Sequence, residues 1–388
     1  MTREVFIAGI GSTVFGVHKG TSPVALASQA AQQALAEARC APDQIGALYL
    51  GNFVSGVLNG QEVLAGLVGD RIGLGPVPCT KVEGACASGG IAFRHAYLAV
   101  AHGLCDAAIA VGVETMTHAA TPQVTSALNC ALDPGDDVMA GLTFPGLFGL
   151  IWNAHAARYG TTREQVAAIV TKNKANGARN PLAQMGGQIG LDEIVQAPLI
   201  ADPLRRHDCS PISDGAAAVV LTSEALARRA GVEPIRVLAS AQCRGTPYVG
   251  GHGDLTSFGA TVAAANRAYA DAGISARDLS FVELHDCFSI AEIADSEDLG
   301  IVPRGQGGRW ALEGRTAVGG EMPINPSGGL LAKGHPVGAT GLGQVYESVL
   351  QLRGQHPNQV AGARTAATHN LGGTGVVCVV NILQRSGA

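Results

Sequence analysis

The chain alternates short runs of β-branched and apolar residues with longer stretches in which apolar residues recur at helical spacing. The first pattern predicts strands over Met1–Phe6, Val77–Val82, Ala107–Val113, Ala216–Leu221 and Val376–Ile382. The second predicts helices over Cys86–His102, Thr162–Ala175 and Gly338–Arg353, the middle one capped by Thr161 or Thr162. Strands that alternate with helices in this order predict an α/β architecture.

The chain also repeats itself. Residues 34–52 (ALAEARCAPDQIGALYLGN) and 268–286 (AYADAGISARDLSFVELHD) share a helix end, a polar turn, an apolar residue (Ile45 or Leu279) and a short strand. The order matches across several elements at an offset of 234 residues, so two similar halves are favoured over a chance likeness. We expect residues 1–118 with 205–231 to form the first half, 119–204 an inserted loop domain, and 232–388 the second half.

Composition adds that the layers are closely packed. The 388 residues predict two or three domains with a large core, because 47% are hydrophobic and only 15% are charged. The 53 glycines are about twice the usual share of roughly 7%. Small residues allow helices to lie close to sheets, so a tightly stacked protein is expected.

Charge and cysteine usage exclude several classes of protein. A net charge of −5 without a basic block argues against nucleic acid as a partner. The nine cysteines form no zinc-type cluster, so we expect reduced thiols and no metal. The first residues resemble a strand rather than a signal peptide, no stretch is long and apolar enough to span a membrane, and residues 384–388 carry no peroxisomal signal. These features predict a soluble cytoplasmic protein.

Cys86 is the first candidate for chemistry. It lies among small residues in KVEGACASGG (81–90), at a predicted strand-to-helix turn. The helix N-terminus is expected to lower the pKa of this thiol, and the small neighbours leave room for a substrate carbonyl. A buried structural cysteine in a tight turn is the equally weighted alternative on local evidence.

Two motifs in the second half supply partners for this thiol. His285 and Cys287, in VELHDCFS (282–289), follow a predicted strand at the edge where α/β sheets place ligands. His335 lies in the glycine-rich run 325–341, where Pro336 restricts the backbone and the histidine suits a base for a nearby thiol. The alternative for His285 and Cys287 is a purely structural role. The alternative for the glycine-rich run is a surface loop in which His335 is solvated and has no catalytic role. A third turn, HNLGGTG (369–375), offers backbone N–H groups.

The predicted insertion carries further candidates. Its basic side chains could meet phosphates or could form an ordinary solvated face, and they are Arg158, Arg163, Lys172, Lys174 and Arg179. Residues 144–152 are expected to line the pocket. The segment Gly9–Gly11 lacks the third glycine of a dinucleotide fingerprint, so it is given no cofactor role.

Taken together, these motifs resemble the thiolase superfamily, and within it the SCP2-thiolase-like branch. The resemblance spans the whole chain. It rests on the cysteine turn (81–90), VGVETM (111–116), SPISDGAA (210–217), HDCF (285–288), NPSGGLLAKGHP (325–336) and HNLGGTG (369–375). It implies the thiolase fold, in which two similar βαβαβαββ halves stack as a five-layered αβαβα core with an inserted loop domain. It also implies a homodimer that pairs through its N-terminal halves.

The resemblance implies roles for individual residues. Cys86 would be the acylated nucleophile, His335 would take its proton, and Cys287 would act as general acid and base at the α-carbon. His285 and His335 would bind the enolate oxygen, and the backbone N–H groups of Cys86 and Gly372 would form a second oxyanion hole. Most thiolases carry the second cysteine at the position of Asn370, and here Cys287 replaces it. Ser210 and Asn370 would contact CoA or the acyl substrate.

The implied activity is that of an acyltransferase of lipid metabolism, acting in β-oxidation-type cleavage of a 3-oxoacyl-CoA or in the reverse Claisen condensation. Coenzyme A would be a substrate, with no permanently bound cofactor. Two alternatives are a retro-aldol carbon–carbon lyase and a non-catalytic lipid- or CoA-binding subunit. Intact Cys86 and His335 disfavour the lyase, and the absence of an appended sterol-carrier segment disfavours the carrier. The insertion is short for a thiolase loop domain, so a small zinc-ribbon/OB-fold accessory subunit is hypothesised. The acyl chain and reaction direction stay open.

Overall fold

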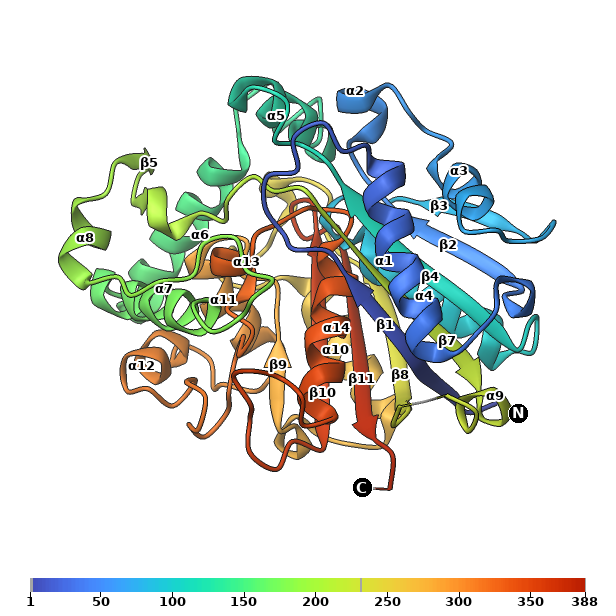
Figure 1. Ribbon diagram of the computed structural model, residues 1–388. Helices are drawn as coiled ribbons and strands as arrows, with labels where there is room; N and C mark the ends of the chain where they lie inside the picture. Colours follow the sequence, from blue (N-terminus) through green and yellow to red (C-terminus); the bar gives the residue numbers. More distant parts are fainter. Residues whose placement is uncertain (1–2, 231, 388) are drawn as a thin grey trace.

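The computed structural model describes residues 3–230 and 232–387 and shows a large mixed sheet enclosed by helices (Figure 1). Its strands run in the order β3-β2-β4-β7-β1-β8-β11-β10-β9. Their bounds are β1 (Val5–Ser12), β2 (Ala47–Gly51), β3 (Cys79–Val82), β4 (Ala107–Glu114), β7 (Gly215–Ser223), β8 (Ile235–Arg244), β9 (Phe281–Glu283), β10 (Thr365–Gly372) and β11 (Val377–Arg385). A separate hairpin joins β5 (Leu199–Ala201) and β6 (Leu204–Arg205).

The three helices predicted from apolar periodicity occur as α4, α7 and α14, with small shifts at their ends. They are α1 (Pro23–Ala38), α2 (Ser55–Asn59), α3 (Leu64–Arg71), α4 (Ser88–Ala101), α5 (Thr121–Leu128), α6 (Phe144–Tyr159), α7 (Arg163–Gly177), α8 (Leu191–Gln196), α9 (Glu224–Ala227), α10 (Gly259–Ala272), α11 (Ser289–Asp298), α12 (Gly307–Leu312), α13 (Gly329–Lys333) and α14 (Thr340–Leu352). Thr162 caps α7, because its hydroxyl accepts the Gln165 N–H. The first predicted strand begins only at Val5, and residues 1–2 lie outside the described residues.

The internal repeat is present in three dimensions. In the first half α1 leads through the 3₁₀ turn Pro42–Gln44 into β2, and in the second half α10 leads through Ala276–Asp278 into β9. The apolar residues that the repeat places before each short strand, Ile45 and Leu279, are both buried. Each repeated strand pairs in parallel with a neighbour, β2 with β4 and β9 with β10. The prediction of two similar halves from the repeated sequence is therefore confirmed.

The two halves stack in five layers. The strands of the first half (β1 to β4 and β7) meet those of the second (β8 to β11) where β1 pairs with β8, from Val5–Val237 to Ile7–Ile235. Helices α4 and α14 share an apolar core with residues of both sets of strands. Helices α1 and α3 cover the outer side of the first set, and α10 and α11 cover the outer side of the second. The predicted thiolase-type αβαβα order is confirmed.

Small residues explain how closely these layers approach. A Cβ at Gly9 of β1 would lie 2.2 Å from the Ala34 carbonyl oxygen of α1, and one at Gly11 would lie 2.1 Å from that of Ala30. Any larger residue would force helix and strand apart. The two glycines serve packing, in keeping with the absence of a predicted cofactor role.

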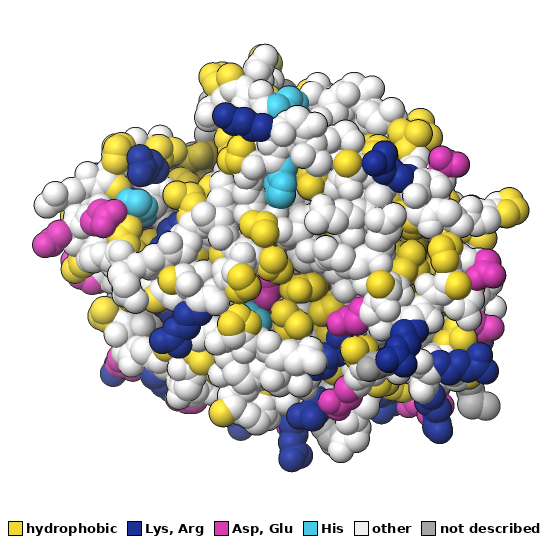
Figure 2. All heavy atoms as spheres, viewed as in Figure 1, with side chains coloured by type: hydrophobic (Ala, Val, Ile, Leu, Met, Phe, Trp, Pro, Cys, Tyr) yellow, Lys and Arg dark blue, Asp and Glu magenta, His cyan; other side chains and the backbone are white. Residues whose placement is uncertain are grey.

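The segment between β4 and β7 packs mainly on the second half. Helices α6 and α7 share an apolar core with α10 and α11, and Figure 1 shows α6, α7 and α8 on the left of the molecule. The division of the chain at residues 118, 204 and 231 stays a prediction. Along the described chain, none of the helices combines the length and apolarity needed to cross a bilayer. On the face in Figure 2, charged side chains gather along the lower edge, near both termini.

A buried carboxylate supports the segment between α13 and α14. Glu347 accepts hydrogen bonds from Asn180 Nδ2 (3.0 Å) and His356 Nε2 (3.0 Å) and pairs with Lys333 Nζ (3.4 Å). Burial raises the pKa of Glu347, but Lys333, His356 and Asn180 outweigh it and hold the pKa at about 2. Since this value lies below the unfolded one, the ionised group stabilises the fold above about pH 4.5 and loses this effect as pH falls towards 2.

We expect Glu347→Ala to lower the free energy of unfolding by about 3–5 kcal/mol at pH 7, because the buried Lys333 would lose its ion-pair partner. Urea denaturation measures this, and the deficit should shrink as pH falls from about 4.5 towards 2. Glu313→Ala, which removes an exposed partner of Arg309, is the control and should change stability little. Equal effects of the two substitutions would contradict the prediction.

Candidate active site

Cys86 lies in a single 3₁₀ turn (Ala85–Ala87) between β3 and α4. Ala85 adopts a left-handed conformation (φ 50°), which costs about 1–3 kcal/mol for a residue with a side chain. Ser88 braces the turn: its hydroxyl donates to the Ala85 carbonyl (2.6 Å) and accepts the Gly84 N–H (3.0 Å). The braced turn presents Cys86 to a cavity that it lines.

His285 and Cys287 lie in the turn between β9 and α11, and both are buried. The Asp286 carboxylate between them accepts the backbone N–H groups of Leu330 (2.7 Å) and Leu331 (3.3 Å) in α13. A buried carboxylate that accepts two backbone donors fixes both segments. This contact joins the two motifs that the sequence analysis singled out in the second half.

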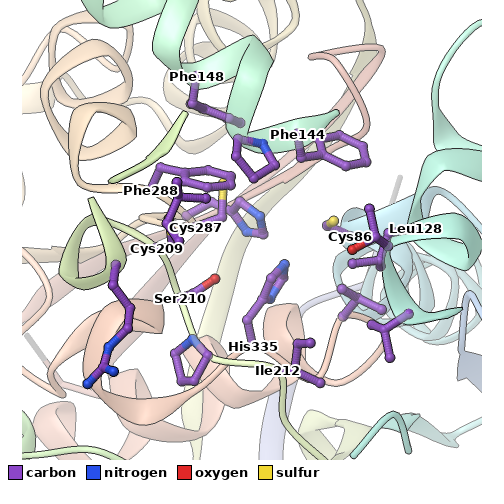
Figure 3. Close-up of a pocket in the computed structure, with 18 of the residues that line it drawn as sticks. Cys86, Leu128, Phe144, Phe148, Cys209, Ser210, Ile212, Cys287, Phe288 and His335 are labelled. Atoms are coloured by element: carbon purple, nitrogen blue, oxygen red, sulfur yellow. The ribbon is translucent and has the colours of Figure 1, made fainter. Parts of the chain in front are cut away.

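His335 lies between α13 and α14, and its Nδ1 contacts the hydroxyl of Thr340. Its Nδ1 lies 2.7 Å from Thr340 Oγ1, and the Thr340 hydroxyl donates to the Pro336 carbonyl (3.1 Å). The single hydroxyl proton can be given either to this carbonyl or to His335 Nδ1. A role of Nε2 as base requires the first arrangement, in which the Nδ1–H of His335 donates to Thr340. In that arrangement Nε2 of the neutral ring carries a lone pair, and Figure 3 shows the ring pointing between Cys86 and Cys287.

The predicted catalytic side chains converge. The Cys86 sulfur and one ring nitrogen each of His285 and His335 lie within 4.8 Å of one another. The two imidazole rings meet edge to face, with centroids 4.9 Å apart and an interplanar angle of 82°. Together with Cys287 they line a cavity of about 430 Å³ (Figure 3). Residues from both halves of the chain thus share one site.

Ser210 and Asn370 were both expected to contact substrate, and the structure separates them. Ser210 lines the cavity, its hydroxyl points into it in Figure 3, and its N–H donates to the Cys287 carbonyl (3.0 Å). Asn370 is buried behind the cavity wall, where its Nδ2 donates to the Cys86 carbonyl (2.9 Å). This placement corrects the expected CoA contact of Asn370.

Gly372, the expected backbone donor, and its neighbour Gly373 lie differently beside Cys86, and the oxyanion role of Gly372 stays a prediction. Gly372 ends β10 and packs against the Cys86 turn, where a Cβ would lie 2.3 Å from the Gly84 carbonyl oxygen. Gly373, with φ 60°, lines the cavity, and its backbone N–H acts to lower the pKa of the Cys86 thiol. A sequence pattern of adjacent glycines does not reveal which of the two N–H groups faces the sulfur.

Burial dominates the protonation of the site. It raises the pKa of Cys86 to about 12, against the hydrogen bond from Gly373 and with a smaller contribution from Glu114. Burial, then the neighbouring Cys86, also raises the pKa of Cys287 well above its usual value. The expected lowering of the Cys86 pKa is therefore wrong for this structure, because the thiol is desolvated and α4 begins only at Ser88.

Burial has the opposite effect on the two histidines. It lowers the pKa of His335 to about 3. It also lowers the pKa of His285 well below its usual value, with further contributions from His335 and His369. Around neutral pH the site therefore holds two thiols and two neutral imidazole rings.

Aromatic side chains form much of the cavity wall. Phe144 and Phe148 come from α6, within the segment 144–152 expected to line the pocket. Phe148 stacks on Phe288, which follows Cys287, with ring centroids 4.6 Å apart and an interplanar angle of 25°. Such a wall favours an apolar group beside the reactive sulfur.

Three cationic or titratable side chains line the cavity as well. Lys174 is buried, its Nζ donates to the Leu331 carbonyl (2.6 Å), and burial lowers its pKa to about 8. Arg206 and His207, which precede Ser210, were not singled out from the sequence. A signal that could have found them is the basic run 205–207, which lies two residues before the motif SPISDGAA (210–217).

The other basic residues of the predicted insertion are bound by protein groups. Their partners are Asp254 for Arg158 (2.5 Å), Asp208 for Arg163 (2.7 Å), Glu292 for Lys172 (2.5 Å) and Asn358 for Arg179 (3.2 Å). Of the five predicted basic residues, Lys174 is the one that lines the cavity. Contact with phosphate stays a prediction for Lys174, and Arg206 and His207 are further basic residues at the same cavity.

The cluster of Cys86, His285 and His335 also has the residue types that bind zinc and other soft ions. No metal was expected from the sequence, and that expectation stays a prediction. Whether the nitrogens can offer lone pairs to an ion depends on which of them carry protons.

Comparison with known proteins identifies the family. Residues 5–225 match "Thiolase, N-terminal domain", and residues 242–385 match "Thiolase C-terminal domain-like". The chain is 43% identical to an acetyl-CoA acetyltransferase of Methanothermobacter thermautotrophicus, covering 99% of this chain and all of that protein. It is 37% identical to a benzoylsuccinyl-CoA thiolase subunit of Thauera aromatica, covering 96% of each chain.

A solved structure agrees with the sequence matches. The structure of the Ltp2-ChsH2(DUF35) aldolase superposes with a TM-score of 0.85 at 24% identity, covering 99% of this chain and 98% of that one. This likeness concerns the fold. The two matched family descriptions together span almost the whole chain, and they agree with the paired halves and the cysteine–histidine cavity. The chain belongs to the thiolase family of acyltransferases.

Proposed function

We propose that the protein cleaves a 3-oxoacyl-CoA with CoA, or runs the reverse Claisen condensation, through an acyl-Cys86 intermediate. The observation that carries this proposal is the approach of the Cys86 sulfur to the His335 and His285 nitrogens in a cavity that Cys287 also lines. A thiol, a base, a donor and a second thiol are the groups that the reaction needs.

The first half-reaction forms the acyl-enzyme. His335 Nε2 takes the Cys86 proton as the sulfur attacks the ketone carbon, and the N–H groups of Cys86 and Gly373 receive the developing oxyanion. The bond between C2 and C3 then breaks. The departing enolate is held by N–H groups of His285 and the now protonated His335, and Cys287 gives its proton to C2.

The second half-reaction returns every proton. The Cys287 thiolate takes the proton of the incoming CoA thiol, and the CoA sulfur attacks the thioester on Cys86. The acyl-CoA leaves, and Cys86 recovers its proton from His335. One thioester is exchanged for another, so the chemistry requires neither ATP nor a redox step.

The cavity also suggests how the substrates lie. The apolar wall of Phe144, Phe148 and Phe288 would receive the acyl group, and Lys174 with Arg206 would attract the phosphate-bearing arm of CoA. A relative that is 37% identical is named for benzoylsuccinyl-CoA, an aromatic acyl group, which agrees with such a wall. Medium-length, branched and aromatic acyl groups are therefore the first to assay.

The lyase and carrier alternatives make less use of this geometry. A retro-aldol lyase depends less on a nucleophilic cysteine, and a carrier needs neither a base nor a second thiol. Here the Cys86 turn is strained and braced, and Thr340 sets His335 as a proton acceptor. The thiolase reaction accounts for both features.

Two partners are part of the proposal. A homodimer is expected from the family, and the edge strand β3 is only partly covered in the single chain. A small zinc-ribbon/OB-fold subunit that helps hold CoA fits the few cations at the cavity. One relative is named as a subunit of a thiolase, and the superposed aldolase carries a name with two components, Ltp2 and ChsH2.

Cys86→Ser should reduce acyl transfer from 3-oxoacyl-CoA substrates to background while the circular dichroism spectrum is unchanged.

Cys287→Ala should stop exchange of the α-protons of acyl-CoA with deuterated solvent, yet allow one round of Cys86 acylation seen by intact-protein mass spectrometry. Cys40→Ala, at a half-buried thiol outside the cavity, is the control. Normal thiolysis by Cys287→Ala would refute the role given to Cys287.

The protonation of Cys86 predicts a pH dependence. Since its pKa is about 12, the thiolate fraction should rise about tenfold per pH unit between pH 6 and 9. The rate of Cys86 alkylation by iodoacetamide, followed by peptide mass spectrometry, should rise in the same way. A plateau below pH 8 would show that the thiolate is already formed in the free enzyme.

The accessory-subunit proposal predicts weak use of the nucleotide part of CoA by the isolated chain. Its kcat/KM values for a CoA thioester and for the matching pantetheine thioester should agree within about tenfold, which corresponds to about 1.4 kcal/mol. Steady-state thiolysis measures both. A strong preference for the CoA thioester by the isolated chain would argue against the subunit.

A further inference from the structure

The Asn370 side chain is held in one orientation by three contacts. Its Oδ1 accepts the Gly90 N–H (3.0 Å), and its Nδ2 donates to the Cys86 carbonyl (2.9 Å) and lies 3.2 Å from His285 Nδ1. A flipped amide would set NH₂ against the Gly90 N–H and oxygen against the Cys86 carbonyl. The flip is excluded because it would replace two hydrogen bonds by two repulsive contacts.

The backbone around Asn370 leaves space for this amide and little else. A Cβ at Gly341 would lie 2.2 Å from Asn370 Oδ1, and one at Gly90 would lie 2.9 Å from the same atom. The helices that carry these glycines, α14 and α4, come from different halves of the chain. The amide is thus seated where the two halves meet.

The fixed amide determines the tautomer of His285. An amide NH₂ can only donate, so His285 Nδ1 must accept with its lone pair. The neutral ring then carries its hydrogen on Nε2, the nitrogen left for the cavity. The backbone of the same residue is held from behind, since the His285 N–H lies 3.3 Å from His369 Nδ1.

We propose that Asn370 is a positioning residue that locks His285 as an Nε2–H donor, opposite to His335, whose Nε2 Thr340 leaves as a proton acceptor. The two rings that meet at Cys86 therefore have different tasks. His335 can take the thiol proton, and His285 can only donate to an oxygen. The kinetic part of this inference rests on the proposed thiolase reaction, whereas the tautomer itself does not.

The same lock bears on metal binding. A metal ion binds a histidine nitrogen through its lone pair, which Nε2 of His285 lacks while Asn370 donates to Nδ1. Asn370 therefore keeps the Cys86–His285–His335 cluster from acting as a three-ligand site for zinc. Its amide protects a reactive thiol from a soft cation without blocking the cavity.

The tautomer of the unmodified protein is the primary test and needs no change at Asn370. Nitrogen NMR of protein labelled with ¹⁵N-histidine distinguishes protonated from unprotonated ring nitrogens, and His285→Gln assigns the signals. We expect His285 to carry its proton on Nε2 and His335 on Nδ1. A proton on Nδ1 of His285 would overturn the inference, whether or not the protein is a thiolase.

Asn370→Asp supplies a gain-of-function test. An aspartate accepts instead of donating, so it should move the His285 proton to Nδ1 and free the Nε2 lone pair. Inhibition of thiolysis by Zn²⁺ should become about tenfold stronger than in Asn370→Ala, the lower end of the usual effect of such partners on metal affinity. Equal sensitivity of the two variants would overturn the lock.

The control is Asn381→Asp, which makes the same substitution at a buried amide that contacts Ser240 and Thr368 instead of a histidine. It should leave the His285 tautomer and the Zn²⁺ sensitivity as in the unmodified protein.

Thiolysis by Asn370→Asp should fall about 10²–10³-fold, the usual cost of one lost oxyanion donor. A loss confined to KM would assign Asn370 to substrate binding and overturn the positioning role.

Discussion

The close approach of the N-terminal ends of α4 and α14 brings the nucleophile and the base together. A Cβ at Gly89 would lie 2.8 Å from the Gly338 carbonyl oxygen, and one at Gly112 would lie 2.4 Å from the same atom. At Gly338 itself a Cβ would lie 2.6 Å from the Val113 carbonyl oxygen. Backbone therefore touches backbone across the two halves. The cysteine turn, the histidine turn and the cavity between them all depend on these glycines.

Much of this arrangement could be predicted from the sequence. The repeat placed a helix, a turn and a strand in each half, and it reported the αβ order because apolar periodicity depends only on local chain geometry. The thiol at the end of β3 and the histidines of the second half could be singled out because their motifs are long and specific. Their convergence then followed from the resemblance to the thiolase family.

Other features depend on distances that a linear pattern does not contain. Gly372 and Gly373 are equivalent in the sequence, and only the packing of Gly372 against the cysteine turn distinguishes them. The pKa of Cys86 is set mainly by burial, which depends on groups brought together from distant parts of the chain. Asn370 was expected to face the substrate, but the orientation of an amide follows from its donors and acceptors rather than from its neighbours in the chain.

The seam between the repeated units has a mechanical consequence. The nucleophile belongs to one copy of the αβ unit, and the two imidazoles with the second sulfur belong to the other. A small shift of one half of the chain relative to the other would change the distances between the reacting groups. Such a shift need not unfold the hydrophobic core of either half. The catalytic rate of this protein is therefore sensitive to the alignment of the two halves. A substitution far from the cavity can slow the reaction without unfolding the protein.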